Sequence, residues 1–307
     1  MDDRENRMKD LIIVGGGPAG LSAAIYGARS GMAVTVLDKN PAAGALGYAG
    51  QVNNYPGVIG PVSGPELLEI FRKQARSFGA EVVQEEAMSS ELEGDVKTVR
   101  TYGGEYRAKA VIIASGAMRR DRTLPGEDEF LGKGVSYCTI CDAPFFEGKT
   151  VAITGGIEEM IEELPELQKF AKKLYVITRG KKAAEKLTED EKLKVFGDHK
   201  LKKIEGDLTV EKVTVSSGDE REELEVDGVF IFLPGNKPEV GFLGDQLELK
   251  EDGCVKIDRE DLSTSVKGVY AAGDVTCKRF RQGTLAVGEG CTAALSAISE
   301  IRKKKKQ

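Results

Sequence analysis

Residues 11–20 read Leu11-Ile12-Ile13-Val14-Gly15-Gly16-Gly17-Pro18-Ala19-Gly20, an apolar run that leads directly into a glycine-rich turn. A helical stretch follows, in which Leu21, Ala24 and Ala28 recur on one face, and then a second apolar run, Val34-Thr35-Val36-Leu37. Short apolar runs beside glycines are typical of buried strands, whereas recurrence about every three to four residues is typical of a helix. The segment therefore predicts a strand, a turn, a helix and a second strand.

The glycines of this turn match a nucleotide-binding fingerprint. Gly15 permits a tight turn, Gly17 lets the backbone approach a pyrophosphate, and Gly20 lets helix and strand pack closely. Pro18 suits the first turn of the helix. Asp38 ends the second strand, where a carboxylate can bind the two ribose hydroxyls of an adenosine. Together these residues predict a bound dinucleotide.

The same plan recurs in the second half of the chain. Val151-Ala152-Ile153-Thr154 leads into Gly155-Gly156, a helical stretch runs through Ala171, and Leu174-Tyr175-Val176-Ile177 forms the next strand. A repeated order of this kind indicates an α/β protein with two Rossmann-like three-layer domains.

The strand order predicts that the second domain is inserted into the first. Each repeat continues into alternating polar and β-branched residues, 96–107 or 210–226, and closes with an apolar strand, 110–114 or 228–232. A further apolar strand, 268–272, lies near the C-terminus and is expected to return to the first domain.

We therefore expect a discontinuous nucleotide-binding domain formed by residues 1–117 and 248–307. The inserted domain then spans residues 118–247, with crossings near Arg119 and Leu243. A length of 307 residues favours this division, because it exceeds the size at which a single core usually keeps growing.

The second fingerprint is degenerate. In register with the first, Gly155 is kept, Ile157 replaces the second glycine and Met160 occupies the third small position. A branched side chain at Ile157 blocks close approach by a pyrophosphate. The helix also begins with glutamates and no basic residue, and gathered anions oppose phosphate binding at a helix N-terminus. These glutamates are Glu158, Glu159, Glu162, Glu163 and Glu166. The sequence predicts a nucleotide-domain fold that has lost its nucleotide affinity.

A dithiol motif, Cys138-Thr139-Ile140-Cys141-Asp142, lies between the two fingerprints. The thiolate of such a pair often has a depressed pKa, so it can attack another disulfide near neutral pH. Zinc needs about four ligands, but Cys254, Cys277 and Cys291 stand alone and His199 is the only histidine. The lone histidine also argues against a hydrolase. Proton transfer at the dithiol is therefore assigned to a carboxylate, and Asp142 is adjacent.

The composition is that of a soluble globular protein, with 40% hydrophobic and 31% charged residues and a net charge of -6. The charge gives no general reason to bind nucleic acid, and no apolar run of about 18 residues indicates a membrane span. Residues 1–9 lack the apolar core of a signal peptide, so we expect a cytoplasmic protein. In that compartment cysteines favour catalytic over structural use. The basic residues 302–306 predict a solvated tail.

With the dithiol placed between two Rossmann-like units, the chain closely resembles the low-molecular-weight thioredoxin reductases over nearly its whole length. The motifs are Gly15–Gly20, Asn54-Tyr55-Pro56-Gly57, Ala114-Ser115-Gly116-Ala117, Gly134-Val135-Ser136-Tyr137-Cys138-Thr139-Ile140-Cys141-Asp142, Ala272-Gly273-Asp274-Val275 and Arg281-Gln282. Glutathione-reductase-like flavoenzymes instead carry their cysteines in the first domain, where the equivalent residues 44–50 contain none.

The resemblance implies a homodimer with FAD in the first domain. Asn54 would lie near the flavin, Gly273 and Asp274 at the pyrophosphate and ribityl chain, and Gln282 at the ring. The implied FAD-binding residues are Gly15, Gly17, Pro18, Ala19, Gly20, Asp38, Lys39, Leu46, Asn54, Ala114, Gly116, Gly273, Asp274, Arg281 and Gln282.

The resemblance also implies roles for the dithiol in an oxidoreductase that reduces thioredoxin. Cys141 would face the flavin, Cys138 would attack the thioredoxin disulfide, and Asp142 would move protons between them. Reduced flavin would open the Cys138–Cys141 disulfide, and the dithiol would exchange with thioredoxin through a mixed disulfide. Since one pair must meet both flavin and thioredoxin, the inserted domain is expected to rotate between two orientations.

Two departures from the family concern the electron donor. The second glycine pattern is broken, and the family's histidine and two arginines for the NADPH 2'-phosphate are read here as Thr178-Arg179-Gly180. This combination resembles the ferredoxin-dependent flavin thioredoxin reductases, whose donor is a small acidic iron-sulfur protein. A basic cluster could dock such a partner, or form a solvated face balanced by nearby glutamates. Its members are Lys169, Lys172, Lys173, Arg179, Lys181, Lys182 and Lys186.

Other interpretations stay open at this point. Reduced deazaflavin or NAD(P)H are alternative donors. A flavin-binding redox sensor without turnover is a second class of function, and an oxygen-consuming flavin oxidase ranks last because only the flavin supports it. Among the remaining cysteines, Cys277 stands where the family usually has an acidic residue, but a redox role is not favoured there. Cys291 is read as a buried small residue on a helix, and Cys254 is assigned no role.

Overall fold

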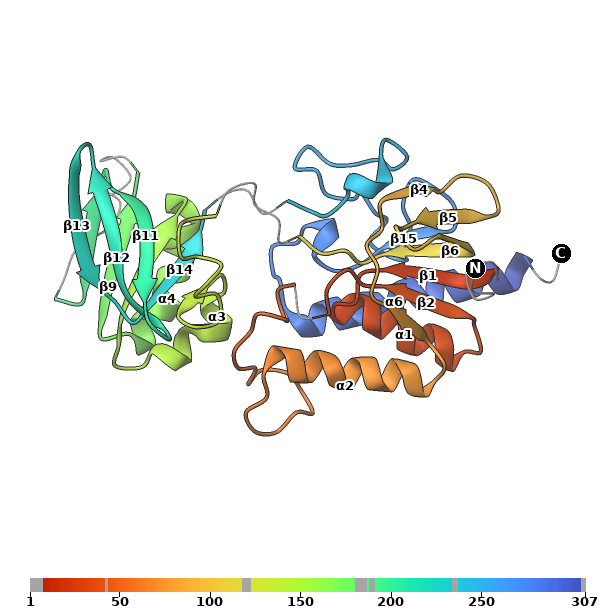
Figure 1. The fold of residues 1–307 in the computed structure, drawn as a ribbon, viewed down its shortest axis with the longest axis horizontal. Helices are drawn as coiled ribbons and strands as arrows, with labels where there is room; N and C mark the ends of the chain where they lie inside the picture. Colours follow the sequence, from red (N-terminus) through yellow and green to blue (C-terminus); the bar gives the residue numbers. More distant parts are fainter. Residues whose placement is uncertain are drawn as a thin grey trace. The chain divides into compact units, whose positions relative to one another are not determined.

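The structure is a computed structural model that describes residues 8–41, 44–117, 123–179, 187, 191–233 and 237–304. The chain forms two compact units. The first comprises Met1–Ala49, Tyr55–Arg119 and Asn236–Gln307, and the second comprises Gly50–Asn54 and Arg120–Gly235. In Figure 1 the red N-terminal strands and the blue C-terminal helix α6 (Gly283–Lys304) lie in the same unit, whereas the green elements form the other.

The first unit is built on a seven-stranded sheet with the order β3-β2-β1-β6-β5-β4, and β15 pairs with β6. Its strands are β1 (Lys9–Val14), β2 (Val34–Leu37), β3 (Glu81–Val83), β4 (Ser89–Glu91), β5 (Lys97–Arg100), β6 (Glu105–Ile113) and β15 (Val269–Ala271). β1 is parallel to β2 and β6, and β15 is parallel to β6, whereas β4, β5 and β6 pair antiparallel. Alternate residues of β1 enter different cores, since Leu11 and Ile13 face one and Ile12 and Val14 face the other. The sheet is therefore covered on both faces.

The helices α1 (Pro18–Arg29) and α6 pack together on one of these cores. Their contact is made by small residues, and a Cβ at Gly290 would lie 1.9 Å from the carbonyl oxygen of Ala19. A third helix, α2 (Gly64–Ser77), begins at a capping box in which Ser63 and Glu66 satisfy each other's backbone N–H groups. None of the helices in the described residues combines the length and apolar character needed to cross a bilayer.

The second unit contains a five-stranded parallel sheet and a three-stranded antiparallel sheet, with the orders β10-β9-β8-β14-β7 and β11-β12-β13. Its strands are β7 (Val135–Ser136), β8 (Thr150–Gly155), β9 (Lys173–Thr178), β10 (Leu193–Gly197), β11 (Lys200–Gly206), β12 (Val210–Ser217), β13 (Glu220–Glu225) and β14 (Gly228–Phe232). Helix α4 (Ile157–Phe170) shares a core with β8 and β9, and the antiparallel sheet shares a core with the opposite faces of β8, β9 and β14. This unit therefore repeats the three-layer plan of the first, and the predicted fold class is confirmed.

Some details differ from the sequence expectations. The antiparallel residues before 107 and the apolar strand at 110–114 form one continuous strand, β6, and helix α2 had no predicted counterpart. The chain rejoins the first unit at Asn236, ahead of the expected residue 248, because Leu243 and Leu247 are buried in a core of that unit. The expected crossing at Arg119 and the tail residues 305–306 lie outside the described residues.

Candidate active site

Four parallel strands of the first unit end at the same edge of the sheet. Gly15 follows β1, Asp38 follows β2, Ala114 follows β6, and Gly273 lies just beyond β15. Backbone hydrogen bonds hold these ends together, from Gly15 to the Leu37 carbonyl at 2.8 Å and from Ala114 to the Val14 carbonyl at 2.7 Å. Ligands of open α/β sheets bind outside the carboxyl ends of the strands. The fold therefore gathers widely separated predicted residues around one site.

Two of the fingerprint glycines, Gly15 and Gly20, lie so close to neighbouring backbone that a Cβ would not fit. Gly15 has a φ of 111°, and a Cβ there would lie 2.2 Å from the Ala114 carbonyl oxygen. A Cβ at Gly20 would lie 1.9 Å from the Gly15 carbonyl oxygen. Gly17 is different, because a Cβ there would meet no atom within 4 Å. Gly17 is the N-cap of α1, whose first turn carries no acidic residue, so this helix end is open to an anion.

Asp38 has the environment expected of a ribose-binding carboxylate. The residue is 8% exposed, and its Oδ2 has no hydrogen-bond partner among the described residues. Burial raises the pKa of this carboxyl, which the charge of Arg72 partly opposes. A buried acceptor without a donor is costly, and two ribose hydroxyls would supply donors. The residues of this site therefore fit the adenosine and pyrophosphate of FAD.

The segment after β15 also contributes to the site. Gly273, with a φ of 80°, donates its N–H to Glu289 of α6 at 2.8 Å, and a Cβ on Gly273 would lie 3.1 Å from Ala19 Cβ. Burial raises the pKa of Asp274, and the nearby charges of Arg281 and Lys278 lower it. Lys278 also forms an ion pair with Glu289.

The remaining predicted FAD residues lie as follows. Pro18 and Ala19 open α1, and Gly116, with a φ of 77°, accepts a hydrogen bond from the Glu239 N–H at 3.1 Å. Lys39 forms an ion pair with Glu239 at 3.1 Å. Leu46 accepts a backbone hydrogen bond from Ala49, and Gln282 accepts one from Ala286 at the start of α6. Asn54 belongs to the segment 50–54 of the second unit, so it is not part of the gathered strand ends.

The dithiol lies in the second unit as a disulfide between Cys138 and Cys141, with Cα atoms 5.3 Å apart. Cys138 is the N-cap of the short helix α3 (Thr139–Asp142), and its sulfur accepts the Cys141 N–H at 3.2 Å. Both cysteines are half-buried, while Ile140 between them is 55% exposed. The disulfide is therefore held at the surface of the unit, within reach of another molecule.

Asp142 is the carboxyl next to this disulfide. It is largely buried, and its Oδ2 accepts a hydrogen bond from Ser136 Oγ at 2.5 Å. Burial raises the pKa of Asp142, and the Ser136 hydrogen bond lowers it in part. A carboxyl with a raised pKa exchanges protons closer to neutral pH, as a proton donor beside a thiolate must.

Sequence reasoning gave no role to two polar residues that support the dithiol turn. Ser136 bonds both the Asp142 carboxylate and the Cys138 N–H, the latter at 3.1 Å. Thr139 is fully buried and donates a hydrogen bond from Oγ1 to Glu163 of α4. Ser136 shares its motif with the hydroxyls of Tyr137 and Thr139, and the sequence does not show which of the three contacts Asp142. The Glu163 contact spans 24 positions, and nothing in the sequence marks it.

The second fingerprint retains a cavity. A space of about 260 Å³ is lined by the Gly155-Gly156 turn, Ile157, Arg179 and Lys200. Met160 lies on α4, and its side chain is fully buried in the core of this unit. It is not among the residues that line the cavity. Of the predicted phosphate motif, Thr178 is buried at the end of β9 and Arg179 is exposed, while Gly180 lies outside the described residues.

The described members of the basic cluster differ in their surroundings. Lys172 and Arg179 are exposed, Lys169 pairs with Glu166 of the same helix, and Lys173 lies over the ring of Tyr175 at 5.1 Å. Lys181, Lys182 and Lys186 lie outside the described residues.

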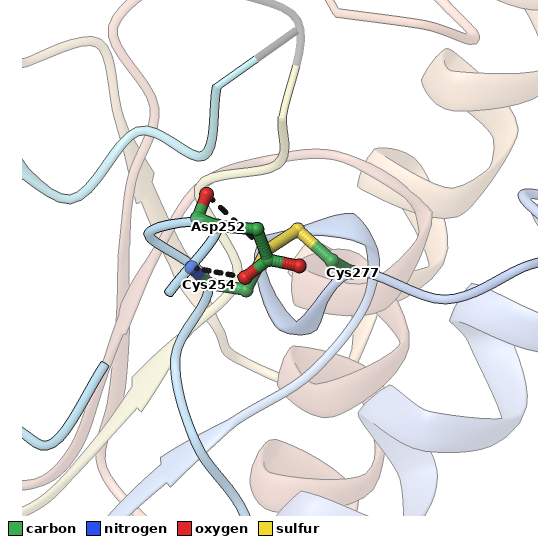
Figure 2. Close-up of side chains that lie close together, drawn as sticks. All are labelled: Asp252, Cys254 and Cys277. Carbon is green, nitrogen blue, oxygen red and sulfur yellow. Dashed lines mark hydrogen bonds between the residues drawn. A yellow bond between two sulfur atoms is a disulfide. The ribbon is translucent and has the colours of Figure 1, made fainter. Parts of the chain in front are cut away.

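The expectation that Cys254 and Cys277 stand alone is wrong. They form a disulfide in the first unit, with Cα atoms 5.7 Å apart, and Figure 2 shows the Asp252 carboxylate beside it. The pairing arises because the backbone N–H of Val255 donates to the Val275 carbonyl, which brings neighbouring segments together. Spacing in the sequence gives no sign of this contact. Cys291 is a free, half-buried thiol on α6.

Comparison with known proteins gives a consistent result. The model of the family "Pyridine nucleotide-disulphide oxidoreductase" matches residues 9–290. A thioredoxin reductase from Aquifex aeolicus is 45% identical over 310 residues, covering 98% of this chain and 96% of that protein. The crystal structure of thioredoxin reductase from Streptococcus pyogenes is 33% identical, with a TM-score of 0.88 and coverage of 97% and 99% of the two chains. A ferredoxin-flavin thioredoxin reductase from Clostridium acetobutylicum is 35% identical, with a TM-score of 0.53 and coverage of 96% and 99%.

Proposed function

Because the chain belongs to the pyridine nucleotide-disulphide oxidoreductase family, and within it to the thioredoxin reductases, we propose that it reduces the disulfide of thioredoxin. The chain is an FAD-binding oxidoreductase that acts on disulfides. The observation that carries the proposal is the surface disulfide Cys138–Cys141 next to the buried carboxyl of Asp142.

The residues of this turn suit the exchange chemistry. FAD, when bound, supplies the electron pair that opens the Cys138–Cys141 disulfide. Opening consumes two protons, and Asp142, adjacent to Cys141 in the sequence, would deliver and remove protons at the two sulfurs. The Cys138 thiolate then attacks a sulfur of the thioredoxin disulfide, and the Cys141 thiolate attacks Cys138 in turn. This second attack restores the disulfide and releases thioredoxin with two thiols.

The proposed electron donor is ferredoxin. Ile157 lines the cavity where a pyrophosphate would need a glycine, and α4 begins with glutamates that disfavour an anion. Similarity to the ferredoxin-flavin enzyme of Clostridium acetobutylicum supports the same donor. We also propose that the chain acts as a homodimer, as its resemblance to the family implies.

A second candidate donor, NADPH, is favoured by one observation. The cavity beside the Gly155-Gly156 turn is still open, and Arg179 and Lys200 give its lining two cations. Met160 leaves this cavity free, because its side chain is buried in the core. A reduced deazaflavin is a third donor to be tested beside these two.

The donor is tested by anaerobic bleaching of the flavin absorbance. The purified protein is mixed in turn with NADPH, NADH, reduced deazaflavin and reduced ferredoxin, and oxidised thioredoxin is then added. We expect bleaching by ferredoxin and return of the colour with thioredoxin. Rapid bleaching by NADPH would overturn the ferredoxin assignment. If no donor supports repeated reduction of thioredoxin, the proposed function fails, and the redox sensor without turnover and the flavin oxidase are the alternatives to test next.

A further inference from the structure

The Cys254–Cys277 disulfide lies next to the loop that contributes to the FAD site. Cys277 directly follows the short 3-10 helix η3 (Asp274–Thr276), whose first residue is preceded by Gly273. Two backbone hydrogen bonds hold this loop, from the Thr276 N–H to the Gly273 carbonyl at 3.1 Å and from the Cys277 N–H to the Asp274 carbonyl at 3.0 Å. The Thr276 hydroxyl also donates to the Gly273 carbonyl at 2.9 Å. The position of Cys277 is therefore coupled to that of Gly273 and Asp274.

Cys254 anchors the other side of the bond on a hairpin. Its carbonyl accepts the Lys250 N–H at 2.8 Å, and Leu249 bridges to Val255. Two further contacts join the hairpin to the loop, from the Val255 N–H to the Val275 carbonyl at 3.0 Å and from Lys250 Nζ to the Thr276 carbonyl at 2.9 Å. The disulfide is the covalent member of this set, and it links segments 23 positions apart.

The two sulfurs differ in accessibility. Cys254 is 0% exposed, whereas Cys277 is half-buried. Of the two residues only Cys277 is partly exposed, so an external thiolate would attack there and Cys254 would be the leaving group. The carboxylate of Asp252 lies within 4.8 Å of both sulfurs, and its Oδ1 accepts the Cys254 N–H at 3.1 Å. In Figure 2 this carboxylate and the disulfide lie together.

The backbone conformation at Cys277 needs surrounding bonds to maintain it. Its φ of 47° lies in the left-handed region, which residues other than glycine and asparagine rarely adopt. Such a conformation persists where surrounding bonds over-determine it. If the disulfide opens, one of the bonds that hold this conformation is lost, and a change of φ at Cys277 would displace the loop that carries Asp274.

We propose that Cys254–Cys277 is a second thiol–disulfide exchange site, and that its reduction weakens FAD binding by loosening the Gly273–Asp274 loop. A dithiol reductant supplies the two electrons and two protons. Its first thiolate attacks Cys277, Cys254 leaves and is protonated, and the second thiol of the reductant displaces Cys277 to form the reductant's own disulfide. A low-molecular-weight disulfide reverses the reaction. The inference rests on FAD binding to the first unit and is independent of thioredoxin reduction.

The test uses the Cys138→Ser/Cys141→Ser protein, which keeps Cys254, Cys277 and Cys291. The protein is treated with dithiothreitol and divided. One part is alkylated and digested so that peptide masses report the state of the thiols, and the Kd for FAD is measured on the other part, which is left unalkylated. We expect a linked Cys254–Cys277 peptide before treatment. After reduction we expect an FAD Kd about tenfold higher, within the usual range of couplings between two sites. Reoxidation with oxidised dithiothreitol should restore the affinity.

Two variants separate the disulfide from other effects. Cys277→Ser should bind FAD about as weakly as the reduced protein and respond no further to dithiothreitol. Cys291→Ser should keep the full response. Free thiols at both positions before treatment, or an unchanged FAD Kd in protein whose alkylated portion shows both thiols reduced, would overturn the inference. Failure to reduce thioredoxin in the unmodified protein would count only against the proposed function, because these readouts do not involve turnover.

Discussion

Ser136 donates a hydrogen bond from its Oγ to Asp142 Oδ2 at 2.5 Å, inside the turn that holds the Cys138–Cys141 disulfide. Burial raises the pKa of the Asp142 carboxyl, and this hydrogen bond lowers it. Burial and a hydrogen bond from a residue six positions away thus act in opposite directions on the protonation of the carboxyl that we propose serves both sulfurs. The balance between them is open to measurement.

Ser136→Ala should move the pH dependence of thioredoxin reduction. The substitution removes the hydrogen bond that favours the charged carboxylate, so the pKa of Asp142 should rise further. The limb of the kcat profile that belongs to this carboxyl should shift to higher pH. Ser136→Thr keeps a hydroxyl and serves as the matched control. A limb that stays in place in Ser136→Ala, or that survives in Asp142→Asn, would show that another group titrates.

Asp142 should also make stability depend on pH. Its pKa is higher in the folded protein than in the unfolded chain, so its favourable contribution is complete below about pH 4 and is lost as the pH rises through the folded pKa. Asp142→Asn cannot ionise and avoids this loss. The Tm of the variant minus that of the unmodified protein should therefore increase as the pH rises from about 4 to 8. Parallel Tm curves for the two proteins would contradict the buried, raised-pKa assignment.

Cys138→Ser should abolish the reduction of thioredoxin and leave FAD bound, because the sulfur is lost from the second unit while the proposed FAD residues other than Asn54 lie in the first. Activity should fall to the background rate, and the flavin absorbance per protein should be unchanged. Cys291→Ser removes a thiol that forms no disulfide, and it should retain activity. Turnover of Cys138→Ser at the unmodified rate would remove the dithiol from the proposed mechanism.

The fold and the family could be predicted from the sequence because both depend on local signals. Apolar runs beside Gly15 and Gly155 are repeated at matching positions, and the family inferred from the motifs is confirmed. The Cys254–Cys277 disulfide was missed because it depends on how a hairpin packs against a loop. The burial of Leu243 and Leu247 in the first unit, which resumes at Asn236, is likewise a tertiary contact. Local patterns do not encode contacts of this kind.

Gly17→Ala should weaken FAD binding without damaging the fold. A Cβ at Gly17 would meet no protein atom within 4 Å, so it would clash only with a ligand bound at the N-terminus of α1. Overpacking of about 1–3 kcal/mol corresponds to a rise in the FAD Kd of about five- to 150-fold. Gly156→Ala is the matched control, because Gly156 is the N-cap of α4 and is equally unobstructed. We expect unchanged FAD affinity there and unchanged Tm for both apoproteins; equal FAD affinity in both variants would exclude Gly17 from the site.

Lys172→Glu tests the docking of ferredoxin on the basic cluster of the second unit. Lys172 is exposed at the turn between α4 and β9, so a negative charge there should repel an acidic partner. We expect kcat/KM for reduced ferredoxin to fall by about tenfold at low salt, and the difference to shrink as the salt concentration approaches about 1 M. Lys256→Glu changes the net charge equally but lies in the first unit, where Lys256 pairs with Glu248. Since the overall charge affects both variants alike, a selective loss in Lys172→Glu would identify a docking face. An equal loss in both would instead favour a solvated surface that influences ferredoxin only through the net charge of the protein.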